Sequence, residues 1–97
     1  MDTHAQIHWV QQCIMHQIDA HMEHGDIAES GPHAVLAFAH ETVHHCISKI
    51  HVQHAMHMHV HLQDTGALQH ITDHDRIPAL CTYFNDWVSL QLAMRYA

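Results

Sequence analysis

The chain has 97 residues, which predicts one small domain spanning residues 1–97 with a modest hydrophobic core. Ten acidic residues against three lysines and arginines give a net charge of −7 with neutral histidine, a balance that argues against nucleic-acid binding. No apolar run reaches the length of a membrane helix and no apolar leader opens the chain, so we expect a cytoplasmic protein that is not inserted in a membrane.

Histidine is the unusual feature of the composition. The chain has sixteen histidines, and protonation of all of them would raise the net charge from −7 to +9. Because histidine titrates near pH 6.5, we expect a pH-sensitive surface whose charge changes sign in mild acid. The composition is compatible with a metal-handling protein, with adaptation to acid, or with engineering of surface positions to histidine.

The first predicted helix ends near Gly25 and is capped by Asp2 or Thr3. Its apolar residues recur every three or four positions: Ile7, Val10, Ile14, Ile18 and Met22. The segment 24–33, HGDIAESGPH, is rich in glycine and acidic residues and predicts a loop.

A second helical stripe follows this loop. Ser30 can cap the helix ahead of Pro32. The stripe consists of Leu36, Ala39, Val43, Cys46, Ile47 and Ile50. Residues 56–62, MHMHVHL, alternate between apolar residues and histidine, as in a strand. We expect the helix to continue through this stretch, because no turn signal precedes Met56, and an α+β fold with a short strand at 55–62 is the alternative.

The last part of the chain returns to helical spacing. QDTG at 63–66 predicts a turn, a short helix is expected from about Gly66 to His74, and a break is expected before Pro78. The final stripe consists of Ile77, Leu80, Cys81, Phe84, Trp87, Val88 and Leu92. The predicted fold is therefore all-α, a small three- to four-helix bundle, and dimerisation is expected because the chain is short.

Cys13, Cys46 and Cys81 are odd in number, far apart and without a CxxC motif, so they do not predict a disulfide scaffold. They are interpreted as buried free thiols, and a cysteine joining histidines in a metal site is the alternative.

Several histidine pairs are spaced four residues apart, so that on a helix they face the same way and can share one metal ion. His33, His40, His44 and His51 fall on one line of a continuous second helix, within about 40° of one another. The candidate metal ligands are His40 and His44 first, then His51, His57 and His61, with His4 and His8 as the first-helix pair. Zinc is the preferred metal; nickel, copper and haem are alternatives.

HETVH at 40–44 resembles the HExxH motif of zinc metallopeptidases, in which both histidines bind zinc and the glutamate is the general base. That resemblance would make Glu41 the base. HETVHHCISKIHVQ at 40–53 resembles the phosphoacceptor helix of sensor histidine kinases and would make His40 the phosphoryl carrier.

From these observations we expect a helical bundle that binds a divalent transition metal for storage or structure, with Glu41 orienting an imidazole. The alternative function is a metal-free interaction or scaffold protein with a histidine-coated surface. A zinc hydrolase or a histidine phosphotransfer domain comes third, and a homo-oligomer is expected in every case.

Overall fold

The computed structural model describes residues 2–23, 31–68 and 73–96. Within these ranges lie the α-helices α1 (Thr3–Glu23), α2 (Pro32–Ser48), α3 (Val52–Asp64) and α4 (Arg76–Tyr96), with a short 3-10 helix, η2 (Asp73–Asp75), directly before α4. The described residues contain no strand, which confirms the prediction of a small all-α bundle.

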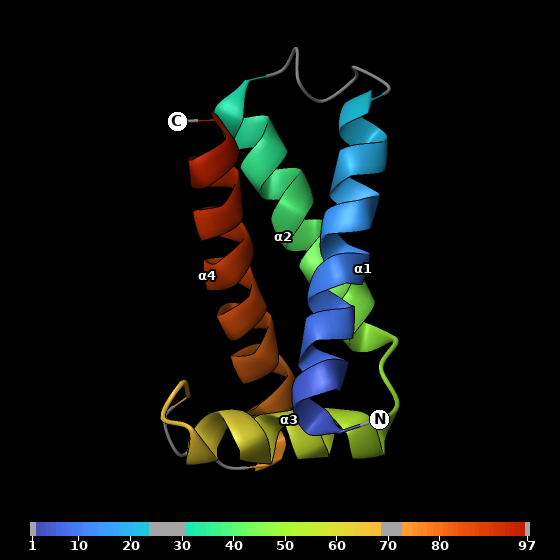
Figure 1. Ribbon diagram of the computed structural model, residues 1–97, viewed down its shortest axis with the longest axis vertical. Coiled ribbons are helices and arrows are strands. Elements are labelled where there is room, and N and C mark those ends of the chain that lie inside the picture. Colours follow the sequence, from blue (N-terminus) through green and yellow to red (C-terminus); the bar gives the residue numbers. More distant parts are fainter. Residues whose placement is uncertain (1, 24–30, 69–72, 97) are drawn as a thin grey trace.

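Three helices, α1, α2 and α4, extend along the length of the molecule, and α3 crosses their lower end (Figure 1). α2 packs against α4 and α1, and α3 contacts α1 and α4. Since α2 and α4 run in opposite directions (Figure 1), residues early in α4 lie opposite residues late in α2. This pairing determines which side chains meet in the seam between the two helices.

The core forms where the apolar stripes of the helices meet. Its largest fully buried side chains come from all four helices: Phe84, Ile14, Ile18, Ile47, Met58, Leu80, Val43 and Val88. The predicted stripes of α1 and α2 are confirmed, because every member is buried or packs against the core. In α4, Ile77 was predicted to be buried but is 38% exposed, since it lies in the first turn, at the end of the bundle.

Two helix ends confirm their predicted signals. The Asp2 carboxylate accepts a hydrogen bond from the backbone N–H of Ala5 at 2.7 Å and so caps α1. After α3, Gly66 has a φ of 81°, and the Leu68 N–H donates to the Leu62 carbonyl at 3.0 Å. This left-handed glycine ends the helix at the predicted QDTG turn.

Other predicted boundaries fall partly outside the described residues. α2 begins at Pro32 after Gly31, whose φ is 97°, while Gly25, Ser30 and residues 24–30 as a whole lie outside the described ranges. The helix predicted over 66–74 is not found at 66–68, which form a turn and bend, nor at Asp73–Asp75, which is 3-10; residues 69–72 are outside the described ranges.

The alternative of a strand at 55–62 is wrong, because these residues belong to α3. Four buried side chains in α3 have helical spacing: Ala55, Met58, His59 and Leu62. Met58 and His59 are adjacent in the chain and both buried, which a strand with one buried and one exposed face would not allow. Packing against α1 and α4 therefore favours a helix here, although the local sequence alternates as in a strand.

The continuous helix expected through residues 40–61 is also wrong. α2 ends at Ser48, where the N–H groups of Lys49 and Ile50 bind carbonyls three residues back, those of Cys46 at 3.3 Å and Ile47 at 3.2 Å. His51 then caps a new helix. The break predicted before Pro78 falls slightly earlier, since Pro78 lies in the first turn of α4, where its missing N–H costs no helical hydrogen bond.

Candidate metal centre

His40 and His44 lie on one face of α2, four residues apart, and both contact α4. The Nε2 atom of His40 is 3.2 Å from the Ser89 hydroxyl oxygen. The Nδ1 atom of His44 is 3.8 Å from the Cys81 sulfur. Two of the predicted ligands are therefore in the seam between α2 and α4, in contact with side chains that can donate or accept.

The α4 side of this seam consists of Cys81, Asn85 and Ser89, each one helical turn after the last. The Ser89 hydroxyl donates to the Asn85 carbonyl at 2.8 Å, so its single proton is used there. Ser89 must then accept a hydrogen bond from His40, which places a proton on Nε2 of His40 and leaves the lone pair of a neutral ring on Nδ1.

Asn85 carries a polar atom that needs a partner. Its side-chain oxygen, Oδ1, is buried and has no hydrogen-bond donor among the described residues. Such an oxygen is unfavourable when buried alone and is a suitable ligand or water acceptor. It lies in the turn between Cys81 and Ser89, the two α4 residues that contact the histidines of α2.

Burial raises the pKa of the Cys81 thiol. The sulfur is therefore protonated at neutral pH, and its S–H can donate to Nδ1 of His44. A buried, protonated thiol is a poor nucleophile. It remains a good metal ligand, because a bound metal ion displaces the thiol proton.

As the side chains stand, the described ranges contain no group of three or more His, Cys, Asp and Glu side chains arranged to hold a metal ion. What the seam provides is one preformed pair, His44 and Cys81, with His40 one turn away. A complete site needs the His40 ring to rotate toward that pair.

The predicted line of four histidines on α2 is wrong at one end. His51 lies beyond the end of α2, where its Nδ1 accepts the Gln53 N–H at 3.2 Å as the cap of α3 and its ring centroid is 5.7 Å from that of His54. His33 stays on α2 but is exposed. Because of the helix break, His51 is not on the face of α2 that carries His40 and His44.

Three other predicted ligands, His4, His8 and His61, lie together where α1 meets α3. His4, His8 and His61 line a small cavity of about 280 Å³, and the ring centroids of His4 and His61 are 6.4 Å apart. His57, predicted as the partner of His61, is exposed on α3. The two histidines of this pair are therefore in different surroundings, since His57 is on the surface of α3 and His61 is beside α1.

Glu41, the candidate base, is exposed and makes no hydrogen bond or ion pair with a described residue. Its role as a base, and that of His40 as a phosphoryl carrier, stay predictions. The sequence offered a cysteine ligand as an alternative without distinguishing Cys81 from Cys13 and Cys46, and it did not single out Asn85. The available signal was the spacing of Cys81, Asn85 and Ser89 along the flank of the last apolar stripe.

Comparisons with protein-family models, with curated proteins and with solved structures each find no match. In the described part of the chain, no helix combines the length and apolar character that a membrane crossing requires.

Proposed function

We propose that the protein binds a divalent transition metal, zinc by preference, in the seam between α2 and α4, for structural or storage purposes. His44 and Cys81 are the first two ligands, and His40 is the third. A water molecule or the Asn85 side-chain oxygen takes the fourth position of a tetrahedral site.

The distance between His44 and Cys81 carries the proposal. Zinc bonds of about 2.0–2.1 Å to nitrogen and about 2.3 Å to sulfur, at a tetrahedral angle, place the two ligand atoms about 3.6 Å apart. The observed separation of Nδ1 and Sγ is 3.8 Å. A zinc ion would therefore fit between these atoms after a movement of a few tenths of an ångström.

The chemistry of the ligands, and the hydrogen-bond acceptor beside one of them, agree with this assignment. A set of imidazole and thiolate suits zinc, and it does not suit magnesium or calcium, which prefer oxygen. Metal-bound histidines usually donate their other ring N–H to a fixed acceptor, and the Ser89 hydroxyl would be that acceptor for His40 if Nδ1 bound the metal after the ring moved. Because the ligands come from two helices, binding would staple α2 to α4 and stabilise the fold.

Cobalt(II) titration tests the proposal, because cobalt bound to a thiolate gives a ligand-to-metal absorption band that cobalt bound only to imidazole lacks. We expect one cobalt ion per chain, that band, and a higher midpoint of thermal unfolding, all removed by Cys81→Ala. His44→Ala should weaken binding at least about tenfold. His45→Ala is the matched control, since His45 is exposed on the same helix and its side chain makes no hydrogen bond with a described residue of α4. An unchanged band in Cys81→Ala contradicts the proposal.

A metal-free interaction protein with a histidine coat is the second candidate. The observation that favours it is exposure: of the described histidines, only His40, His59 and His61 are not exposed. A coat should take up metal weakly and in a graded way, with no thiolate band, and a chelator should leave its unfolding midpoint unchanged. The cobalt titration therefore separates the two functions.

A further inference from the structure

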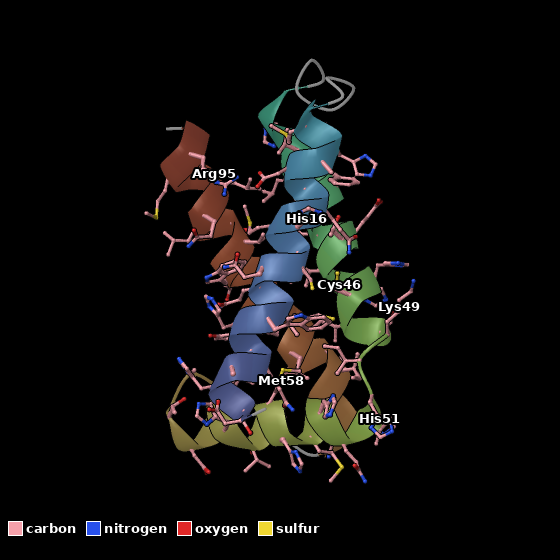
Figure 2. The ribbon with its side chains drawn as sticks, turned by 45° about the vertical axis from the view of Figure 1, so that its right-hand side comes forward. His16, Cys46, Lys49, His51, Met58 and Arg95 are labelled. Carbon is pink, nitrogen blue, oxygen red and sulfur yellow. The ribbon has the colours of Figure 1, made fainter. Side chains whose placement is uncertain are left out.

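A cavity lies away from the proposed metal seam, among α1, the end of α2 and the start of α3. It has a volume of about 650 Å³, within the range of drug-sized ligand sites. Cys46, Lys49, His51 and Met58 are labelled around it in Figure 2. None of the residues proposed to bind metal in the seam lines it.

The body of this cavity is apolar. Trp9, Val10, Ile50 and Met58 line it, and Trp9 is 57% exposed, although tryptophan usually buries most of its surface. Met58 is fully buried at the floor, while Trp9 stands at the open side. The lining therefore offers an aromatic ring and flexible aliphatic surface to an apolar molecule.

The charge around the cavity is the reverse of the charge of the chain. The chain has ten acidic residues, yet the described residues that line this cavity include no carboxylate, whereas Lys49, the chain's only lysine, is among them. Lys49 forms no ion pair with a described residue, whereas Arg95 pairs with Asp19. His51 and His54, with ring centroids 5.7 Å apart, lie beside Lys49 in the lining.

We propose that this cavity binds a small amphipathic anion, a molecule with an aromatic or aliphatic body and one carboxylate or sulfonate group. The body lies between Trp9 and Met58, and the anionic group lies against Lys49 and the two histidines. Because the described lining has no carboxylate, the repulsion that a chain of net charge −7 exerts on an anion is weaker in this cavity than beside an acidic side chain.

Fluorescence of anilinonaphthalene sulfonate, an aromatic probe with one sulfonate, tests the proposal on the full chain. We expect saturable binding of one probe per chain, accompanied by quenching of Trp9. Dodecanoate should displace the probe at least about tenfold more effectively than dodecanol, because only the carboxylate can pair with Lys49. Equal displacement by the neutral alcohol would overturn the assignment.

Lys49→Gln and Arg95→Gln form a matched pair, since each removes one positive charge from an exposed side chain. Lys49 borders the cavity, and Arg95 lies at the far end of α4 (Figure 2). Lys49→Gln should weaken binding of the probe at least about fivefold, and Arg95→Gln should change it by less than about twofold. Equal effects of the two variants would reject the site.

The cysteines give a second readout that does not depend on the probe's fluorescence. Cys13 and Cys46 line the cavity, and Cys81 lies outside it. Saturating dodecanoate should slow alkylation of Cys13 and Cys46 by a neutral maleimide at least about threefold and leave Cys81 unchanged. Equal protection of all three thiols, or of none, contradicts a ligand held in this cavity.

Discussion

The Cys81 thiol connects the metal proposal to a measurable proton. Because burial raises the pKa of Cys81, the sulfur is protonated at neutral pH and must lose its proton when metal binds. Zinc affinity, measured by competition with a chelator, should therefore fall about tenfold per pH unit between about pH 8 and about pH 7, where histidine is still mainly neutral.

The slope of zinc affinity against pH distinguishes this site from a site whose ligands are all histidines. Below about pH 6.5 the histidines also take up protons, so the decrease should become steeper. Cys81→Ala should remove the decrease between about pH 8 and about pH 7 and keep the steeper part in acid. A wild-type affinity that is flat across that upper range would show that no thiol ligates the metal.

The same thiols predict a loss of stability in alkali. Burial raises the pKa of Cys81, and burial, followed by the neighbouring Cys13, raises the pKa of Cys46, above a reference of 9.0. The folded chain thus keeps its thiol protons to higher pH than the unfolded chain, so its stability is complete below the unfolded pKa and decreases as pH rises above it.

Urea unfolding with chelator present measures this effect. The denaturation midpoint should decrease from about pH 8 to about pH 10, and the decrease should be smaller in the double variant Cys46→Ala, Cys81→Ala. The comparison is between slopes, because removing two packed side chains lowers the midpoint at every pH. Parallel slopes would assign the alkaline loss to other groups.

At the scale of helices, the four-residue spacing of apolar side chains was sufficient to predict α1, α2 and α4. It left an alternative open where two patterns overlapped, although the helix that we expected there is confirmed. In MHMHVHL the alternation of apolar residues with histidine favours a strand, yet Met58, His59 and Leu62 pack inward together on a helix. The local pattern alone does not decide between helix and strand here, because the choice depends on which side chains pack against α1 and α4.

Methionine substitutions in α3 test this assignment. Met56, Met58 and Val60 would point the same way in a strand, but Met58 is fully buried while Met56 is 41% and Val60 53% exposed. In urea unfolding at a chain concentration that keeps the protein monomeric, Met58→Ala should therefore destabilise it by about 2–5 kcal/mol, and Met56→Ala or Val60→Ala by about 0.5 kcal/mol or less. Similar losses at all three positions would contradict the packing of α3.

The candidate site was predictable only in part, for the same reason. The spacing of His40 and His44 fixes their shared face, because both are well inside α2. Their partners on α4 depend on the antiparallel packing of two helices far apart in sequence, which brings Cys81 to His44 and Ser89 to His40. The predicted position of His51 is wrong because α2 ends after Ser48 without a glycine or proline in the sequence to indicate the break. The break is made by two backbone hydrogen bonds to carbonyls three residues back.

For the whole molecule, the expected homo-oligomer stays a prediction, and α3 indicates where to test it. Val52, Met56 and Val60 are 66%, 41% and 53% exposed and are spaced four residues apart on the outer face of the helix. α3 crosses the end of the bundle (Figure 1), and the exposure of these three side chains places them on the side of α3 that the other helices do not cover. Asp64, in the last turn, is the only acidic residue of α3.

We expect two copies to pair through this face, because the repulsion between chains of net charge −7 is weakest where carboxylates are fewest. Light scattering during gel filtration at neutral pH should give twice the chain mass of 11.2 kDa. Met56→Lys places a charge in the middle of the row and should return the protein to the monomer, whereas Leu90→Lys, at a 59% exposed position on α4, should not. If Met56→Lys remained dimeric, the interface would not be at this face of α3. If the wild-type protein were a monomer, the expected dimer would be wrong, and a chain of this size would fold without the additional burial that a second copy provides.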